Sequence, residues 1–473
     1  MHRHYLALDL GAESGRAILA RLADGRIELT ELHRFPNTPV RLPNGLYWDT
    51  LRLFHEICEG IRVAAKASEH LDGIAIDTWG VDFGLLGADG ALLENPRHYR
   101  DARTQGAPGE VFRTVPRSEI FRQTGIQFME INSLYQLWAI RRDSPELLEA
   151  ASRLLFMPDL FNYFLTGALV SERTIASTSQ FYDPVHKRFA TEMLQRLGIG
   201  GNLFAAPAEP GAPLGPLLPY AADVCALKRD ALVYTTGSHD TASAVAAIPA
   251  SPGNNWCYIS SGTWSLMGVE LDDPIINDAS LESNFTNEVG VAGKIRFLKN
   301  IPGLWLLQEC RRAWSKEGHE YSYTELMERA AVAKPTDTVL DLDRFASPGN
   351  HPERIREYCR RTGQEIPEDA ASTARVILRS MAVRYSEVLA LLERLTGRTI
   401  EVIHIAGGGS RSKLLNQLTA DITGRRVMAG PVEATAAGNA LTQALGAGDI
   451  GSLDELREVM RGSFDVEEFR PQT

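Results

Sequence analysis

The chain has 473 residues, a length that predicts two to three domains. Apolar residues make up 44% and charged residues 23%, which is typical of a globular protein. Its net charge of −11 argues against a nucleic-acid partner or an anionic membrane, because both require a basic surface. The apolar runs are too short to cross a bilayer, and Asp9 interrupts the first run before a signal-like core develops. These features favour a cytoplasmic enzyme.

The cysteines are spread along the chain without a Cys-x-x-Cys pair or a Cys/His metal spacing. An odd number of cysteines without a signal peptide indicates mostly reduced, buried thiols. Whether any two of them pair is not determined by the sequence. The five are Cys58, Cys225, Cys257, Cys310 and Cys359.

Residues 4–35 predict a meander of three strands. Residues 4–10 and 16–22 are two nearly continuous apolar runs, and alternating residues from 27 to 35 predict the third strand. The dipeptide Asp24-Gly25 between the second and third runs is a hairpin turn signal.

The connection from Asp9 to Arg16 has two interpretations. Gly11 and Gly15 allow a tight or left-handed backbone, so that backbone N–H groups and the Ser14 hydroxyl can converge on a phosphate. In that case Asp9 can hold a hydrated Mg²⁺ against the phosphate. The alternative is an ordinary glycine-rich hairpin with no ligand.

A helix from about Thr50 to Ala67 precedes a strand and loop at residues 73–83, and a second hairpin is expected at residues 87–90. The loop contains Trp79 and Phe83 beside carboxylates, a combination that suits a sugar, because an aromatic face packs on C–H groups while acids accept hydroxyl protons. The alternative is an aromatic plug of the core.

The middle of the chain predicts helices near residues 132–142 and 146–156, and a connector over the surface at residues 205–219, which is rich in proline and glycine. A strand follows at residues 231–235.

Asp240 lies between that strand and a run of small residues that predicts a buried helix. A short polar loop between a strand and a helix is a common place for reactive side chains, and Asp240 is the only acid in this one. The alternative is that Asp240 is the N-cap of the helix, since aspartate is favoured there.

The second half repeats the layout of the first. Residues 255–270 predict a strand, a turn of small residues at 260–263 and another strand, as residues 4–20 do. Two similar hairpins, one opening each half, indicate duplicated domains that face each other across a cleft. Because the hairpin occurs twice, the prediction that its turns bind phosphate is stronger than it would be for one hairpin alone.

The last part of the chain predicts a nucleotide loop. A buried helix is expected from about Ala370 to Leu395, ending at Gly397. Residues 401–412 then predict a strand, a triple-glycine loop and a helix from about Lys413, whose N-terminus favours a phosphate. The sequence has no P-loop, and the Gly-x-Gly-x-x-Gly at residues 446–451 follows a helical run, which indicates a helix end.

These motifs, in this order, resemble the FGGY family of carbohydrate kinases over nearly the whole chain. Within that family, several long stretches are similar to the kinases that phosphorylate L-rhamnulose. The stretches are residues 9–16, 76–83, 125–128, 238–245, 260–268 and 430–434. The resemblance implies an α/β, two-domain actin/ribonuclease-H-like fold, a duplicated mixed sheet flanked by helices, with ATP and sugar in the cleft between the domains. It implies an N-terminal domain at residues 1–242 for the sugar and the first phosphate hairpin, and an ATP-binding domain at residues 243–473.

The resemblance also implies roles for individual residues. Asp240 matches the general base that accepts the proton of the attacking sugar hydroxyl, and Asp9 would help to place Mg²⁺. The positions that match sugar contacts are Gly80, His239, Asp240, Thr241 and Asn300. The positions that match ATP contacts are Ala12, Glu13, Ser14, Gly15, Arg16, Thr263, Gln308 and Gly408. In the family that the sequence resembles, small polar residues are also common at the position of Glu13, which is a bulkier and acidic residue.

The implied reaction is Mg·ATP-dependent phosphorylation of L-rhamnulose at its 1-hydroxyl. One alternative is a kinase of the same fold for another ketose or polyol. The other is a protein without catalytic activity that senses a sugar or a nucleotide. The partners expected are a small sugar and ATP, and the sequence leaves open a monomer or a small homo-oligomer.

Overall fold

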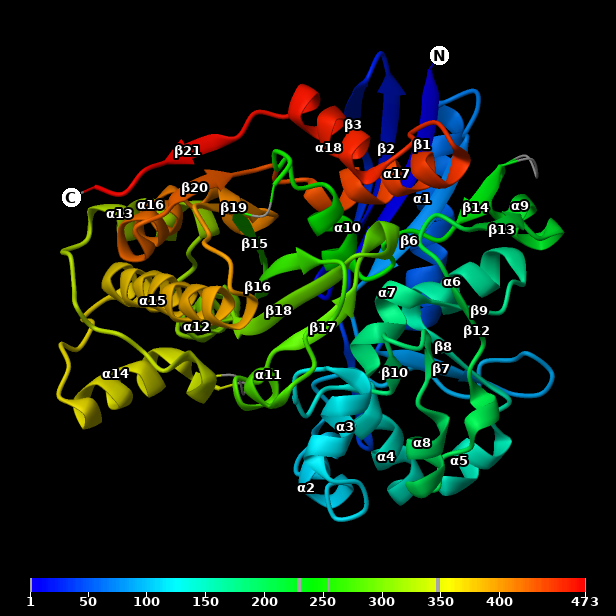
Figure 1. Cartoon of the computed structure of the whole chain (residues 1–473), viewed down its shortest axis with the longest axis horizontal. Helices are drawn as coiled ribbons and strands as arrows, with labels where there is room; N and C mark the ends of the chain where they lie inside the picture. Colours follow the sequence, from blue (N-terminus) through cyan, green and yellow to red (C-terminus); the bar gives the residue numbers. More distant parts are fainter. Residues whose placement is uncertain (1, 228–230, 254, 346–348, 473) are drawn as a thin grey trace. The chain divides into compact units, whose positions relative to one another are not determined.

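The computed structural model describes residues 2–227, 231–253, 255–345 and 349–472. It divides into two compact units, each built on one main sheet with helices beside it (Figure 1). The first unit consists of Met1–Pro249, Glu270–Phe297 and Ala434–Ser463, and the second of Ala250–Val269, Leu298–Glu433 and Phe464–Thr473. These units group residues by packing and each combines separate segments of the chain. The predicted domain boundary between residues 242 and 243 divides the sequence into two halves and stays a prediction.

The first sheet contains six strands among the described residues, in the order β13-β14-β6-β1-β2-β3. Strand β1 is antiparallel to β2 and parallel to β6, which is also parallel to β14. The carboxyl ends of β1, β6 and β14 therefore lie at the same edge. The strands are β1 (Arg3–Leu10), β2 (Ser14–Ala23), β3 (Arg26–Pro36), β6 (Gly73–Thr78), β13 (Pro213–Pro216) and β14 (Leu232–Tyr234).

The second sheet has the order β17-β18-β16-β15-β19-β20-β21 in the described part of the chain. Its hairpin β15–β16 and its parallel pairs β15–β19 and β19–β20 repeat the arrangement of β1–β2, β1–β6 and β6–β14. The predicted duplication and fold class are thus confirmed. The strands are β15 (Trp256–Ser261), β16 (Trp264–Leu271), β17 (Thr286–Val289), β18 (Ile295–Pro302), β19 (Val402–Ala406), β20 (Arg426–Ala429) and β21 (Glu467–Phe469).

The other elements are short strand pairs and helices. The pairs are β4 (Val40–Leu42) with β5 (Gly45–Tyr47), β7 (Phe83–Leu86) with β8 (Arg153–Phe156), β9 (Val170–Glu172) with β12 (Ala206–Ala208), and β10 (Tyr182–Asp183) with β11 (Arg188–Phe189). The α-helices of the first unit are α1 (Thr50–Ala67), α2 (Ala107–Val111), α3 (Arg117–Thr124), α4 (Ser133–Asp143), α5 (Pro145–Ala150), α6 (Met157–Thr166), α7 (Arg173–Ala176), α8 (Thr191–Arg196), α9 (Pro219–Cys225), α10 (Asp240–Ala246), α11 (Asp278–Glu282), α17 (Ala434–Ala447) and α18 (Leu453–Ser463). Those of the second are α12 (Trp305–Lys316), α13 (Tyr323–Val332), α14 (His351–Thr362), α15 (Ala370–Thr396) and α16 (Lys413–Thr423). The 3₁₀ turns are η1 (Ala102–Thr104), η2 (Ser177–Ser179), η3 (Gly201–Leu203), η4 (Val291–Gly293), η5 (Leu342–Phe345) and η6 (Gly408–Arg411).

Elements with strong local signals are confirmed. The meander forms, and Asp24 (φ 52°) and Gly25 (φ 71°) make the left-handed turn that joins β2 to β3. Helix α1 begins at Thr50 after the N-cap Asp49, and α15 ends at Gly397, whose φ of 67° closes the helix. The five cysteines are buried free thiols in the described chain.

Two expectations were wrong in detail, and a third was confirmed. The predicted helix at residues 146–156 stops at Ala150, because Arg153–Phe156 pairs with Phe83–Leu86 as strand β8. The expected surface connector contains β13, an edge strand antiparallel to β14, so it is part of the main sheet. The short hairpin expected at residues 87–90 is present: the Gly90 N–H donates to the Gly87 carbonyl at 3.0 Å, and Leu86 and Leu92 form an antiparallel bridge.

Strand β1 has a different helix on each of its two faces. Leu6, Leu8 and Leu10 point into the core that includes α1 and α6. Ala7, on the opposite face, packs with Ile18 and with Ala436 of α17. The small side chain of Ala7 lets α17 lie close to the sheet.

Helix α17 also packs tightly on α10. Gly438 has no Cβ, and a Cβ placed there would lie 1.9 Å from the carbonyl oxygen of Ser243. This contact joins the helix that begins at Asp240 to a helix nearly 200 residues further along the chain.

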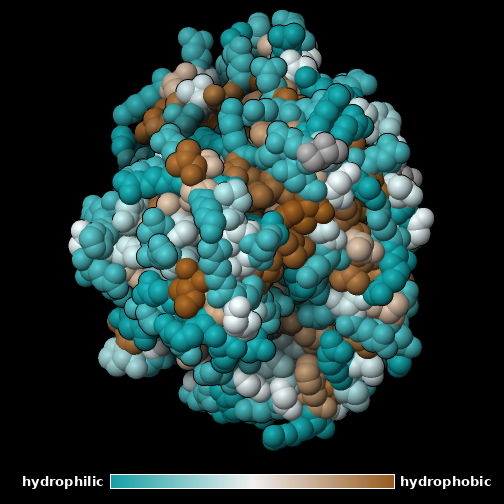
Figure 2. Space-filling view, turned by 90° about the vertical axis from the view of Figure 1, so that its left-hand side faces the viewer, coloured by the Kyte–Doolittle hydropathy of each residue, from teal (hydrophilic) through white to brown (hydrophobic). Residues whose placement is uncertain are grey.

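Among the described residues, no helix combines the length and the apolar character needed to span a membrane. The face in Figure 2 is mainly hydrophilic, with brown apolar areas among the teal residues.

We expect Gly438→Ala to lower the stability of the protein by about 1–3 kcal/mol, because the new methyl group must displace the backbone of α10. The matched control is Gly462→Ala in α18, where the nearest atom to the new Cβ lies 3.8 Å away. That change should leave stability unchanged or raise it by up to about 1 kcal/mol. Thermal melting of both variants tests the contact, and equal melting temperatures would contradict it.

Candidate active site

Three carboxylates meet where parallel strands of the first sheet end. Asp9 on β1 stands opposite Asp77 on β6 in the strand register. The next residue, Thr78, donates its N–H to the Ser238 carbonyl at 2.9 Å and forms a parallel bridge with His239. The loop after β14 therefore brings Asp240 to the same edge of the sheet, which is where ligands bind in open α/β sheets.

Asp240 is the first residue of α10, and His239 occupies the N-cap position without a side-chain cap bond. The interpretation of Asp240 as the N-cap is therefore wrong by one residue. Its Oδ1 accepts from the Thr241 N–H at 2.6 Å and from the Thr241 hydroxyl at 3.1 Å. Burial raises the pKa of Asp240, His239 and Thr241 lower it, and the negative charge of Asp9 raises it further.

Asp77 is fully buried and was not among the predicted site residues. Its Oδ2 accepts from the amide of Asn439 at 2.5 Å, and its Oδ1 has no hydrogen-bond partner among the described residues. Burial and then the charge of Asp9 hold the pKa of Asp77 well above its usual range. An acid that ends an apolar strand was the signal that singled out Asp9, and the same signal applies to Asp77. No local signal points to Asn439.

Asp9 is 7% exposed and pairs with Arg16 of the neighbouring strand, at 2.5 Å between Oδ2 and Nη2. The two residues face each other in the β1–β2 register. Arg16 thus supplies a positive charge directly beside the carboxylates.

The connection between β1 and β2 is a tight turn. The Gly11 N–H donates to the Ser14 carbonyl at 2.9 Å, and Asn37 closes the turn from outside by donating to the carbonyls of Gly11 and Glu13. Neither Gly11 nor Gly15 has a positive φ. Gly15 is required for a different reason, because a Cβ there would lie 2.2 Å from the ring of Phe35. The expected phosphate contacts, residues 12–16, all lie in or directly after this turn.

Gly80 lies beside His239, and Val81 follows it in a strained turn. A Cβ at Gly80 would lie 3.3 Å from Nε2 of His239. Val81 has a φ of 71°, and the Asp82 N–H donates to the Gly80 carbonyl at 3.0 Å, which makes a γ-turn of the rare, strained form. The surroundings hold this turn, since Val81 donates to Thr178 Oγ1 at 3.1 Å and accepts from Ser133 at 2.5 Å.

Asp82 is fully buried, and both of its carboxylate oxygens accept hydrogen bonds from protein groups. One of its oxygens accepts from Trp48 Nε1 at 2.6 Å, Trp79 Nε1 at 2.9 Å and the Tyr99 N–H at 3.2 Å. The other accepts from Gln136 Nε2 at 2.8 Å. Burial raises the pKa of Asp82 to about 6, although these donors, Gln136 first, act to lower it.

The aromatic residues of this loop belong to the core. Trp79 and Phe83 are each 5% exposed, and the Trp79 ring lies 4.1 Å from that of Trp48. The structure therefore supports an aromatic plug at this position and gives no support to a sugar-stacking face.

His239 has contacts on both ring nitrogens and on its backbone. Its N–H donates to the hydroxyl of Thr174 at 3.1 Å. Nε2 lies 3.5 Å from Asp240 Oδ1, while Nδ1 lies 3.2 Å from Glu288 Oε2 and 3.1 Å from Arg296 Nη2. Glu288 and Arg296 are buried and were not predicted, because nothing local in the sequence marks them.

The second unit brings three of the expected ATP contacts together. The turn of β15–β16 contains Thr263, whose carbonyl accepts from the Trp305 N–H at 3.1 Å. Gln308 lies one turn into the helix that begins there. The glycine loop containing Gly408 also reaches this turn, since a Cβ at Gly407 would lie 3.1 Å from the Ser261 carbonyl oxygen. Asn300, the expected sugar contact, lies on β18 in this unit.

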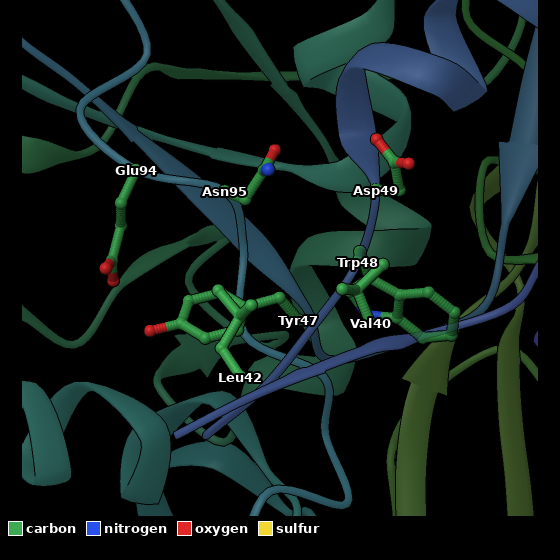
Figure 3. A pocket seen from close by; sticks show the side chains of 7 residues that line it. All are labelled: Val40, Leu42, Tyr47, Trp48, Asp49, Glu94 and Asn95. Atoms are coloured by element: carbon green, nitrogen blue, oxygen red, sulfur yellow. The ribbon is translucent and has the colours of Figure 1, made fainter. Parts of the chain in front are cut away.

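A pocket of about 370 Å³ opens beside the β4–β5 hairpin (Figure 3). Of its residues, Trp48 continues inward to Trp79, at 4.1 Å between the rings. The lining contains none of Asp9, Asp77, His239 and Asp240. It is lined by Val40, Leu42, Tyr47, Trp48, Asp49, Glu94 and Asn95.

Two family models match the chain. The N-terminal domain of the FGGY family of carbohydrate kinases matches residues 4–247, and the C-terminal domain of the same family matches residues 257–447. The chain therefore belongs to the FGGY family of carbohydrate kinases.

Individual relatives extend this result. The chain is 44% identical to a rhamnulokinase of Bacteroides thetaiotaomicron, over 100% of this chain and 96% of the relative. It is 39% identical to a rhamnulokinase of Bacillus subtilis, over 99% of this chain and 95% of the relative. A solved gluconate kinase from Lactobacillus acidophilus shares the fold with a TM-score of 0.82 at 14% identity, over 100% of this chain and 94% of that one.

The raised pKa of Asp82 predicts a pH-dependent stability. The folded state binds a proton at Asp82 more tightly than the unfolded state, so this group stabilises the fold fully below about pH 4 and loses that effect as the pH rises through about 6. Asp82→Asn removes the titration. The stability of the parent relative to this variant should increase by roughly 2–3 kcal/mol between neutral pH and about pH 4.

Thermal melting across that range measures the difference. The control is Asp143→Asn, because the hydrogen bond from Arg142 lowers the pKa of that exposed acid and acidification should give it no such gain. A parent-to-variant difference that does not change with pH would show that Asp82 has an ordinary pKa in the folded state.

Proposed function

We propose that this protein transfers the γ-phosphoryl group of ATP to the 1-hydroxyl of L-rhamnulose. The observation that carries the proposal is the similarity to rhamnulokinases at 36–44% identity across the whole chain. Phosphoryl transfer needs alignment and charge neutralisation more than covalent help from the protein. The residues described above supply both. The cytoplasm is the location that goes with the proposal, because the reaction consumes ATP.

Asp240 is proposed as the general base. It lies at a strand-to-helix junction, with Oδ1 held by Thr241 and its carboxylate partly exposed at the edge of the site. A pKa raised by burial makes a carboxylate a better proton acceptor, as long as it remains ionised at the working pH. Gly80, His239, Thr241 and Asn300 are the proposed sugar contacts.

The proposed ATP contacts are the two hairpin turns and the glycine loop. Backbone N–H groups near residues 12–16 suit phosphate oxygens, and Arg16 adds a positive charge next to Asp9. In the second unit, Thr263, Gln308 and Gly408 gather around a single turn. Residues 1–242 and 243–473 are the corresponding proposed halves for sugar and nucleotide.

The residues at the strand ends fit a magnesium ion. Mg²⁺ binds through one or two carboxylates and keeps water and phosphate oxygens as its other ligands. Asp9 meets this need, and the neighbouring Asp77 has a buried Oδ1 without a partner among the described residues. No group of three or more His, Cys, Asp or Glu suited to a metal occurs in the described chain. Mg²⁺ bound there would neutralise phosphate charge, with Asp9 as the proposed ligand.

Substrate choice is tested with an ADP-release assay on L-rhamnulose, other deoxyketoses, ketoses and polyols. We expect the highest kcat/KM with L-rhamnulose. A missing methyl group changes kcat/KM by about 10-fold to 200-fold, so related ketoses should react more slowly. Turnover of glycerol or D-xylulose without turnover of L-rhamnulose would assign the protein to another kinase of the family. A protein that only senses its ligands would give no turnover at all.

Asp240→Asn separates catalysis from structure. Asparagine keeps an oxygen for the Thr241 N–H but cannot accept the sugar proton, so single-turnover phosphorylation should slow by about 10²-fold to 10⁴-fold. The melting temperature and the ATP affinity should stay close to those of the parent.

The matched control is Asp273→Asn, which changes an exposed acid and should leave turnover unaltered. If Asp240→Asn melts normally and still turns over within a few-fold of the parent, Asp240 is not the base.

A further inference from the structure

A buried ion pair lies behind His239. Arg296 on β18 is fully buried, and its Nη2 lies 3.1 Å from Oε2 of Glu288 on β17. The same Nη2 lies 3.1 Å from Nδ1 of His239. A buried charge must have a function or a good partner, because leaving it in the interior is costly. Here the partner is Glu288, and the contact of Arg296 with His239 is additional to this pair.

Other contacts fix the position of the guanidinium. Arg296 Nε donates to the Val289 carbonyl at 3.2 Å. The N–H of Val289 in turn donates to the hydroxyl of Ser177 at 2.9 Å. Strand β17 is thereby tied to η2, the same turn that supplies Thr178 to Val81. Glu288 and the Val289 carbonyl therefore hold the guanidinium of Arg296 in place beside the imidazole.

The hydrogen bond to Nδ1 determines which tautomer the ring adopts. An arginine N–H only donates, so Nδ1 accepts in its contact with Arg296. The alternative, an Nδ1–H that donates to Glu288 Oε2 at 3.2 Å, would set two N–H donors against each other at 3.1 Å. A neutral imidazole has one donor and one acceptor, and its proton is then on Nε2. Nε2 faces Asp240 Oδ1 at 3.5 Å, and the missing Cβ of Gly80 leaves space on that side.

We infer that Arg296, with Glu288 as its counter-ion, is a positioning residue that fixes the Nε2–H tautomer of His239 and thereby gives the sugar site a hydrogen-bond donor. This inference rests on the proposed function for the identity of the ligand. An Nε2–H donor recognises an oxygen of the sugar that accepts a hydrogen bond. Arg296 itself touches neither the sugar nor ATP in this assignment.

The direct test is nitrogen NMR of histidine-labelled protein, which distinguishes the tautomers of each ring. The chain has 11 histidines, so a His239→Gln variant assigns the signal. The parent should show the Nε2–H form. In Arg296→Met, Nδ1 faces only the carboxylate of Glu288, so the ring should become an Nδ1–H donor.

Kinetics supply the second readout. Losing a hydrogen bond between two neutral groups, here the imidazole N–H and a sugar oxygen, weakens binding by about 2-fold to 10-fold. The KM for L-rhamnulose should rise by that factor in Arg296→Met, while the KM for ATP stays unchanged. Arg296→Lys keeps a cationic donor without the planar fork and should restore part of the sugar affinity.

The control is Arg457→Met. Arg457 also forms an ion pair with a glutamate, Glu270, in the same unit, and this pair is slightly more exposed than that of Arg296. Arg457 lies on α18 and its partner Glu270 on β16, so this variant should leave the His239 signal and the sugar KM unchanged. If Arg296→Met destabilises the fold, the double variant Arg296→Met/Glu288→Leu replaces the pair by apolar side chains of similar size, and its ring should lose the single Nε2–H form.

Three results would overturn the inference: a parent ring that is Nδ1–H or doubly protonated, an Arg296→Met ring that keeps the parental tautomer, or an unchanged sugar KM. The NMR experiment needs no substrate. If the protein does not phosphorylate L-rhamnulose, the proposed function fails while the tautomer assignment is still tested.

Discussion

The register of two parallel strands sets the central constraint of this structure. Because β1 and β6 run in parallel, Asp9 and Asp77 stand opposite each other, and the next strand end adds Asp240. Burial raises the pKa values of Asp77 and Asp240, and the negative charge of Asp9 raises both further. Neighbouring groups compensate for the negative charge of the three acids. Arg16 pairs with Asp9, the amide of Asn439 donates to Asp77, and His239 stands beside Asp240.

A short buried segment holds the site around these acids. In α7 and η2, the hydroxyl of Thr174 receives the His239 N–H, that of Ser177 receives the Val289 N–H, and that of Thr178 receives the Val81 N–H. Each bond fixes the backbone of a different segment. Hydroxyl groups suit this role because they accept and donate at once, and Thr174 also donates to Glu172 at 2.5 Å. The strained turn at Val81 persists because its surroundings hold it on both sides.

Local signals in the sequence were enough for much of the fold. The turn at Asp24-Gly25, the helix after Asp49 and the helix end at Gly397 each depend on a few adjacent residues. Long-range pairing decided the rest. Residues 153–156 become a strand because of their partner at residues 83–86, and Asn439 meets Asp77 across 362 positions. In the candidate site, the order of motifs pointed to Asp240, but the burial of Trp79 and the ion pair behind His239 arise only from three-dimensional packing.

The position of α17 has a consequence for how the protein is made. This helix covers the face of β1 that carries Ala7, yet it is translated more than 180 residues after the first 249 residues of its unit. While the ribosome is still adding the second unit, this face of β1 lacks α17, and Asp77 lacks Asn439. The first unit is therefore completed only near the end of synthesis. Until α17 emerges, the apolar face of the nascent chain is exposed. Aggregation and chaperone binding are therefore expected mainly in this interval.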